Sequence, residues 1–204
     1  MMEVFFLIMA RPKSSDVDAK KRLSEAFWDL LSRQPYNQIT VKSLCSTAKV
    51  NHNTIYYYFS SWEDMVVSFF LDNLDEEIPQ TIFDAVVTGN INPDLLINDQ
   101  SLILRWQRVR LFAGSESEFL KAIFLDSVRR AWLHKLGLKE ADLHTEEKMD
   151  LDFILNGISS LLGNKEYSAP SYFTGFFRRN LGKGVRETLY QLSLKNQSFD
   201  NAAF

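Results

Sequence analysis

The stretch that decides the fold is ITVKSLCSTAKVNHNTIYYYFSSWEDM, residues 39–65. Apolar side chains recur at helical spacing over residues 41–48, and Thr40 in front of them is a residue type that caps helix N-termini. Asn51 is a second such residue and predicts another short helix only a few residues later. Two short helices joined by so tight a turn are typical of a helix-turn-helix, whose second helix enters the major groove of DNA.

Three consecutive tyrosines stand within the second of these helices. Because a helix has 3.6 residues per turn, three neighbours cannot all face one core. With Ile55 and Phe59 inward, Tyr56 and Tyr57 point outward, and Tyr58 lies at the boundary. Two interpretations stay open: the outward rings contact phosphates and thymine methyl groups of DNA, or they pack beneath a neighbouring helix.

The composition is that of a folded, soluble protein. The chain has 204 residues, 46% of them apolar, and no apolar run long enough to span a bilayer. Its single cysteine, Cys45, excludes an intramolecular disulfide and fits a reducing cytoplasm, and its helical position predicts a buried thiol. We therefore expect a cytoplasmic protein without a membrane partner.

The charge is unevenly distributed along the chain. Residues 1–60 contain eight Lys/Arg and five Asp/Glu, whereas residues 61–204 contain fifteen and twenty-one. A basic N-terminal part on an acidic remainder points weakly to nucleic acid at the basic end, against the alternative of random scatter.

Helical periodicity extends over nearly the whole chain and predicts an all-α fold. We expect a flexible N-terminal arm over residues 1–15, the helix-turn-helix domain over 16–60 and a helical domain over 61–204. The capping boxes Ser60-x-x-Glu63 and Ser115-x-x-Glu118 predict helix starts, Pro79 predicts a bend or stop, and Gly182 and Gly184 predict a break in the last helix.

An enzyme is not expected, because no catalytic arrangement can be assembled. The three histidines, His52, His134 and His144, have neither metal-ligand spacing nor a catalytic motif around them. We predict no cofactor and no metal.

Residues 16–70 resemble the DNA-binding region of the tetracycline-repressor (TetR) family of bacterial transcriptional regulators. The family pattern matches in type and spacing at nine positions: Thr40, Ala48, Val50, Thr54, Tyr56, Tyr58, Phe59, Ser61 and Glu63. The resemblance implies an all-helical C-terminal domain that forms the dimer and holds a small molecule. Two positions depart from the pattern, since Lys49 replaces the usual turn glycine and Trp62 replaces a lysine that often contacts phosphate.

By position, the resemblance implies eight DNA-binding residues. Thr40 would cap its helix and contact phosphate, and Lys42 would reach a base edge or phosphate. In the first turn of the recognition helix, three residues would read bases: His52, Asn53 and Thr54. The helical wheel, however, places His52 toward the edge of the core. The three tyrosines that follow would contact the DNA backbone: Tyr56, Tyr57 and Tyr58. Arg11 and Lys13 on the arm would add contacts.

The resemblance also implies sites in the C-terminal domain. Aromatic residues would line an effector pocket: Trp106, Phe112, Phe119, Phe124 and Trp132. Two apolar stripes would form the dimer interface: Leu151, Ile154, Leu155, Ile158, Leu162, Phe173, Phe176 and Phe177. For both sets the alternative is internal core.

Taken together, the sequence predicts a repressor that binds a palindromic operator as a homodimer and is released by a small-molecule effector. The alternative is a helical partner-binding protein whose C-terminal domain recruits another protein without a small-molecule effector.

Overall fold

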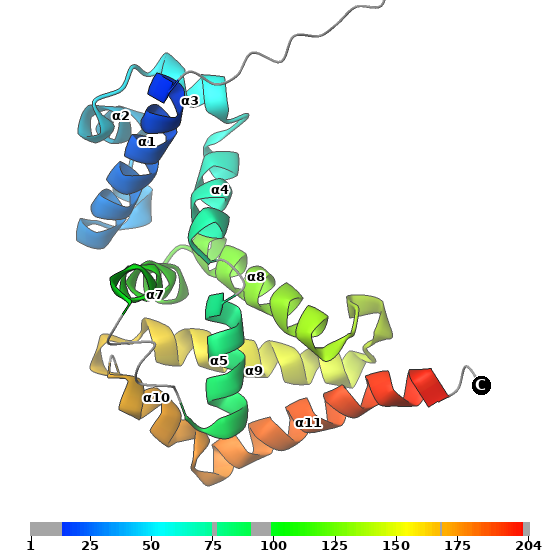
Figure 1. Cartoon of the computed structure of the whole chain (residues 1–204). Helices are drawn as coiled ribbons and strands as arrows, with labels where there is room; N and C mark the ends of the chain where they lie inside the picture. The colour runs from blue at the N-terminus through cyan, green and yellow to red at the C-terminus, as the bar shows by residue number, and fades with distance from the viewer. Residues whose placement is uncertain (1–13, 75–76, 91–98, 168, 202–204) are drawn as a thin grey trace, which may run out of the picture. The chain divides into compact units, whose positions relative to one another are not determined.

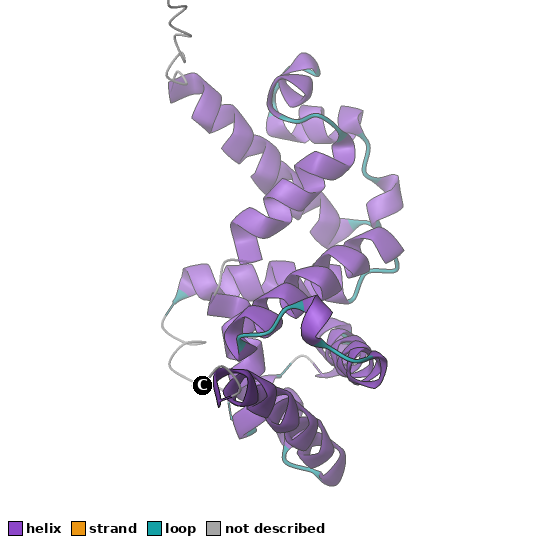
Figure 2. Cartoon of the chain, turned by 90° about the vertical axis from the view of Figure 1, so that its right-hand side faces the viewer, coloured by secondary structure: helices purple, strands orange, loops and turns teal. Residues whose placement is uncertain are grey.

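The computed structural model describes residues 14–74, 77–90, 99–167 and 169–201. Within these ranges the chain forms helices and connecting turns with no strand, which confirms the all-α prediction (Figures 1 and 2). Arg11 and Lys13 of the predicted arm lie outside the described residues, as do residues 91–98 of the loop that follows Thr88.

The chain divides into two compact units, residues 1–65 and 66–204. The division falls inside helix α4 (Trp62–Leu74), a few residues beyond the boundary expected at residues 60/61. Each unit is described by itself below.

The first unit is built on helix α1 (Ser14–Arg33), which packs against α2 (Val41–Ala48). A single turn of 3₁₀ helix, η1 (Tyr36–Gln38), joins them, and α3 (Asn53–Tyr58) follows α2. One face of α1 is apolar and faces inward, since Leu23, Phe27 and Leu31 are buried. Cys45 of α2 is buried as expected, and burial raises the pKa of its thiol.

Among its described residues, the second unit contains the remainder of α4 and six further helices, which Figure 1 labels. These are α5 (Glu77–Thr88), α7 (Gln100–Ala113), α8 (Glu118–Leu136), α9 (Thr145–Gly163), α10 (Pro170–Phe177) and α11 (Asn180–Asn201). Two 3₁₀ turns, η2 (Glu140–Asp142) and η3 (Lys165–Tyr167), flank α9. Helices α7, α8 and α9 pack on one another, and α5 packs on α8, α10 and α11.

Several predicted helix ends shift by one turn or less. Ser117, rather than Ser115, caps α8, because its side chain accepts the Leu120 N–H. Pro79 lies in the first turn of α5, where a missing N–H costs no helical hydrogen bond. The last break falls at residues 178–179, ahead of both Gly182 and Gly184.

Helices α7 and α9 approach each other most closely at two glycines. A Cβ built on Gly163 would lie 2.2 Å from Gly114 Cα, and one on Gly114 would lie 2.6 Å from the Gly163 carbonyl oxygen. Beside this contact, Arg110 Nε donates to the Leu162 carbonyl at 2.8 Å and Ser159 Oγ donates to the Ala113 carbonyl at 3.0 Å. The absent side chains thus allow two helix ends to meet backbone to backbone.

The predicted dimer residues require a correction. Seven of the eight are buried within the chain itself, five on α9 and two on α10: Leu151, Ile154, Leu155, Ile158, Leu162, Phe173 and Phe177. The eighth, Phe176, is half-buried. These side chains are core of the second unit, because α9 turns that face toward α7 and α8. The seven buried side chains are therefore not accessible to a second copy, and the dimer itself stays a prediction.

The predicted effector residues are also packed side chains. Phe112 stacks on Phe70 with ring centroids 4.3 Å apart, and Trp132 donates its indole N–H to the Pro79 carbonyl at 3.0 Å. Trp106 and Phe124 are buried, and Phe119 is half-buried. Their part in binding an effector stays a prediction.

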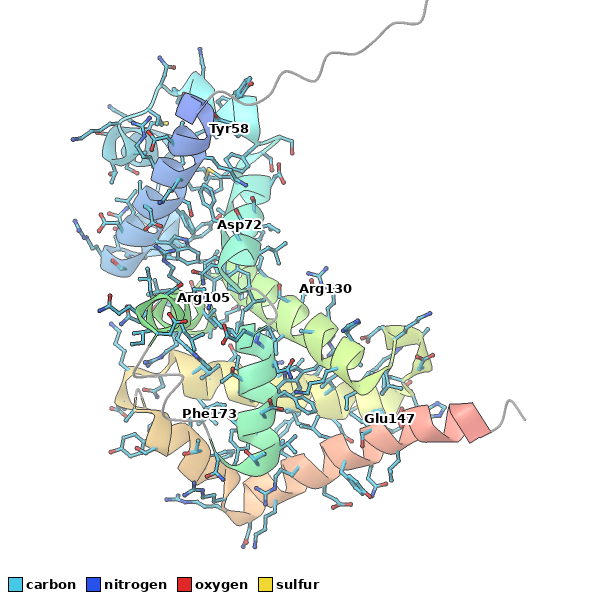
Figure 3. The ribbon with its side chains drawn as sticks, in the orientation of Figure 1. Tyr58, Asp72, Arg105, Arg130, Glu147 and Phe173 are labelled. Carbon is cyan, nitrogen blue, oxygen red and sulfur yellow. The ribbon has the colours of Figure 1, made fainter. Side chains whose placement is uncertain are left out.

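The last helix is tied to the start of α9 by one lysine. Lys195 Nζ lies 2.6 Å from Glu147 Oε2 and donates to the Asp142 carbonyl at 2.9 Å. Figure 3 shows Glu147 beside α11. This contact joins segments far apart in sequence within the second unit.

Candidate nucleic-acid interface

Helix α2 begins in a complete capping box. The Ser43 N–H donates to Thr40 Oγ1 at 3.1 Å, and the Thr40 N–H donates to Ser43 Oγ at 2.9 Å. Two of the helix's first N–H groups are thereby satisfied by side chains. Thr40 is the N-cap that the sequence predicts, whereas its partner Ser43 was not singled out. Thr40 and Lys42 are both exposed.

The start of α3 is capped by Asn51, as predicted. Its Oδ1 accepts the Asn53 N–H at 2.9 Å, and its carbonyl accepts the Thr54 N–H. The first turn presents His52 and Asn53 to solvent, with Thr54 half-buried. The helical wheel was wrong to place His52 toward the core: its ring lies 5.3 Å from that of Tyr56. The backbone of His52 is helical, with φ −54° and ψ −40°, but it stands at the start of α3, where no preceding turn of the helix covers its side chain.

The tyrosine run is divided as the helical spacing requires. Ile55 and Phe59 are buried, whereas Tyr56 is 60% and Tyr57 75% exposed. Tyr58 is half-buried and meets the Tyr57 ring edge-on, with centroids 4.9 Å apart. The interpretation that Tyr56 and Tyr57 pack beneath a neighbouring helix is therefore wrong. Two large rings lie side by side on the outer face of α3, where they are free to contact a partner.

In the turn between α2 and α3, Lys49 adopts a left-handed backbone conformation, with φ 53° and ψ 47°. The N–H groups of Lys49 and Val50 donate back to the carbonyls of Ser46 and Cys45, which closes the helix as a Schellman motif. From α1, Arg22 Nη1 donates to the Lys49 carbonyl at 3.1 Å, and Arg22 Nε lies 3.3 Å from Asp18. Arg22 therefore fixes the turn that aims α3.

Replacing Lys49 by glycine tests this strain. A left-handed conformation costs an L side chain roughly 1–2 kcal/mol, part of which the greater freedom of unfolded glycine offsets. We expect Lys49→Gly to be neutral or to stabilise the chain by up to about 1 kcal/mol in urea unfolding. Lys42→Gly, inside α2, is the control and should destabilise by about 1 kcal/mol. A clear loss of stability in Lys49→Gly would contradict the strain.

The joint between α3 and α4 is set by Asp64. The N–H and the hydroxyl of Ser60 both donate to Asp64 Oδ2 at 2.9 Å, while Ser61 Oγ accepts the Asp64 N–H at 3.0 Å. The capping box predicted for Ser60 and Glu63 is thus shifted by one residue, with Ser61 as cap. The hydrogen bonds from Ser60 lower the pKa of the Asp64 carboxyl.

Because the pKa of Asp64 is lowered in the folded chain, its carboxylate stabilises the fold above the ordinary Asp pKa of about 4. That contribution is lost as the pH falls through the lowered value. We expect wild type to melt at a higher temperature than Asp64→Asn at pH 7, and the difference to vanish in acid. A difference that persists at pH 2 would show that the carboxylate charge is not its source.

Trp62 has a role inside the first unit. Its indole N–H donates to the Tyr36 hydroxyl at 2.8 Å, joining η1 to the first turn of α4. Burial raises the pKa of Tyr36, and the hydrogen bond from Trp62 lowers it by less. Where the family pattern has a lysine aimed at DNA, this chain has an internal contact. Neither Tyr36 nor Arg22 could be identified beforehand, since both act on segments distant in sequence.

These features define a helix-turn-helix DNA-binding protein of the transcription-regulator class, with an exposed aromatic recognition helix. Residues 24–69 match the family model described as "Bacterial regulatory proteins, tetR family". The similarity to the TetR family therefore covers the helix-turn-helix region of this chain.

The chain is similar to part of one transcriptional activator and was also aligned with one solved structure. Over 106 residues the chain is 29% identical to the HTH-type dhaKLM operon transcriptional activator DhaS of Lactococcus lactis subsp. lactis (strain IL1403). The match spans 52% of this chain and 44% of that protein's length. A solved structure, the TetR family repressor AlkX from Dietzia sp. strain DQ12-45-1b, implicated in biodegradation of n-alkanes, aligns with a TM-score of 0.43 and 15% identity. The alignment covers 90% of this chain and 99% of that one. Among the described residues, no helix has the length and apolar character needed to cross a membrane.

Proposed function

We propose that the chain is a cytoplasmic repressor that binds a palindromic operator as a homodimer and releases it when a small molecule binds the second unit. The exposed pair Tyr56 and Tyr57 on α3 carries this proposal. Their hydroxyls suit phosphate oxygens and their rings suit thymine methyl groups. A second copy is required because one recognition helix reads only a few base pairs, and symmetric operators match two-fold symmetric proteins.

The remaining contacts follow from the exposed ends of α2 and α3. We assign phosphate contacts to Thr40 and Lys42 at the start of α2, and the N-terminus of α3 favours a phosphate nearby. His52, Asn53 and Thr54 in the first turn of α3 are assigned to base edges, and Tyr58, half-buried, to the backbone. Trp62 is left out of this set, because its N–H is already donated to Tyr36.

For the effector we propose the neighbourhood of Trp106 on α7. Among the described residues of the second unit, three buried atoms of uncharged side chains have no hydrogen-bond partner: Trp106 Nε1, Asn73 Oδ1 and Ser127 Oγ. Asn73 is placed against α7, where its Nδ2 donates to the Arg105 carbonyl at 3.2 Å. These groups suit a polar molecule that both donates and accepts hydrogen bonds. Phe112, Phe119, Phe124 and Trp132 would then supply apolar packing around it.

A gel shift with the DNA upstream of the chain's own gene tests the proposal. Wild type should retard this DNA and not a shuffled sequence of equal length, and the effector should abolish the shift. A promoter fusion reports the sign of regulation, which matters because DhaS is described as an activator. Absence of a specific shift would favour the partner-binding alternative, and loss of reporter signal on deleting the gene would favour activation.

A further inference from the structure

The exposed surface of α3 carries no charge. Residues 50–62, which contain α3, include no Asp, Glu, Lys or Arg. The exposed side chains of α3 and of the residue before it are one imidazole, one carboxamide and two phenol rings: His52, Asn53, Tyr56 and Tyr57. Arginine and lysine are the residues with which proteins most often read guanine. The recognition helix of this chain therefore lacks the usual means of selecting a G·C pair.

No other side chain of this surface replaces an arginine on guanine. Guanine presents two acceptors, O6 and N7, to the major groove, and a bidentate contact to them needs two donors side by side. The two ring nitrogens of His52 point away from each other, so they cannot both reach one base edge. Asn53 combines a donor with an acceptor, and its oxygen would face one of the two guanine acceptors.

Asn53 and Tyr57 instead match the two bases of an A·T pair. Adenine presents the N6 donor and the N7 acceptor to the major groove, which is the pattern complementary to the Asn53 carboxamide. Thymine carries a C5-methyl group, which takes an apolar contact. The Tyr57 ring is 75% exposed and meets the Tyr58 ring edge-on, with an interplanar angle of 84°. This contact limits how far the exposed ring can swing.

The spacing of the two side chains suits neighbouring base pairs. Asn53 and Tyr57 lie four residues apart on the same side of α3, one turn or about 5.4 Å apart along its axis. Successive bases of one DNA strand lie about 3.4 Å apart along the duplex axis. The two side chains therefore reach base pairs that are one or two steps apart.

We propose that each half-site of the operator presents A·T pairs to α3, with an adenine at Asn53 and, one or two base pairs away, a thymine methyl group at Tyr57. This inference rests on the proposed operator binding and names the bases that are read. In this arrangement α3 itself selects no guanine.

Selection of bound sequences from a random DNA library by the full chain tests this reading. The position whose preference disappears in Asn53→Ala should be adenine, and the position whose preference disappears in Tyr57→Ala should be thymine, at symmetric places in both half-sites. Lys42→Ala is the matched control. It removes an exposed cation at the start of α2, so it should lower the affinity and keep both preferences.

Base analogues test the two contacts atom by atom. Deoxyuridine lacks only the methyl group of thymine, and at the contacted position it should weaken wild-type binding about fourfold per half-site, the effect of burying roughly one methylene equivalent. 7-Deazaadenine lacks the N7 acceptor and should weaken binding at least about fivefold, because the Asn53 donor loses its partner. Tyr57→Ala should bind thymine and uracil sites alike, whereas Tyr57→Phe should still distinguish them, since the ring meets the methyl group.

Salt separates the ring contact from a phosphate contact. A methyl contact releases no counterion, so the ratio of thymine to uracil affinities should be equal at low and at high salt. Two results would overturn this inference and leave operator binding standing: G·C pairs at the positions that depend on Asn53 or Tyr57, or equal wild-type affinity for thymine and uracil sites. Enrichment of no sequence at all would overturn operator binding and this inference together.

Discussion

Gly163→Ala is expected to lower the free energy of unfolding by roughly 3 kcal/mol, near the upper end of what one added methyl group costs. The new Cβ would lie 2.2 Å from Gly114 Cα and 2.5 Å from Gly114 N. Both are backbone atoms, so no rotamer change relieves the overlap, and the ends of α7 and α9 must separate. That movement also stretches the hydrogen bonds of Arg110 to Leu162 and of Ser159 to Ala113.

The matched control is Gly157→Ala in the same helix. Its Cβ meets open space, so alanine's better helix propensity should stabilise the chain by up to about 1 kcal/mol. Urea unfolding of both variants, followed by circular dichroism at a concentration where the chain is monomeric, gives the comparison. If the two substitutions change stability alike, the close crossing of α7 and α9 is incorrect.

Removing both outward side chains of α3, in Asn53→Ala with Tyr57→Ala, is expected to abolish specific operator binding. Each substitution should weaken binding by roughly 1–3 kcal/mol, through a base edge for Asn53 and a phosphate or thymine methyl group for Tyr57. Both side chains are exposed, so the fold should be retained.

Fluorescence anisotropy with labelled operator measures the loss. Tyr190→Ala, which removes a tyrosine of α11 that is 58% exposed, is the control and should bind as wild type does. Circular dichroism confirms that helicity is unchanged. Operator binding by the double variant at wild-type affinity would show that α3 does not read the DNA.

The local parts of the fold were predictable because they depend on neighbours in sequence. The stripe of α1, the caps at Thr40 and Asn51, and the division of the tyrosine run all follow from helical spacing and side-chain hydrogen bonds within four residues. At Lys49 the family pattern has glycine, a residue that suits the left-handed conformation observed there.

What failed depends on contacts between distant segments. Helical periodicity shows that one stripe of α9 is apolar and will be covered. It does not show whether helices of the same chain or of a second copy cover it. Two hydrogen bonds likewise form only once α1, η1 and α4 are assembled. Trp62 donates to the Tyr36 hydroxyl, and Arg22 donates to the Lys49 carbonyl. Burial of core aromatic residues such as Phe112 and Trp132 leaves their role in effector binding unassigned.

The reactivity of the single cysteine can report how often the first unit opens. Cys45 is buried in α2, and its raised pKa keeps the thiol protonated near neutral pH. A thiol reagent can therefore react only after α2 has separated from α1, and thiolate forms more readily once the side chain reaches water. Since no other cysteine occurs in the chain, the rate of labelling counts the openings of the DNA-binding unit alone. Operator or effector added to the reaction would then report whether either ligand changes how often that unit opens.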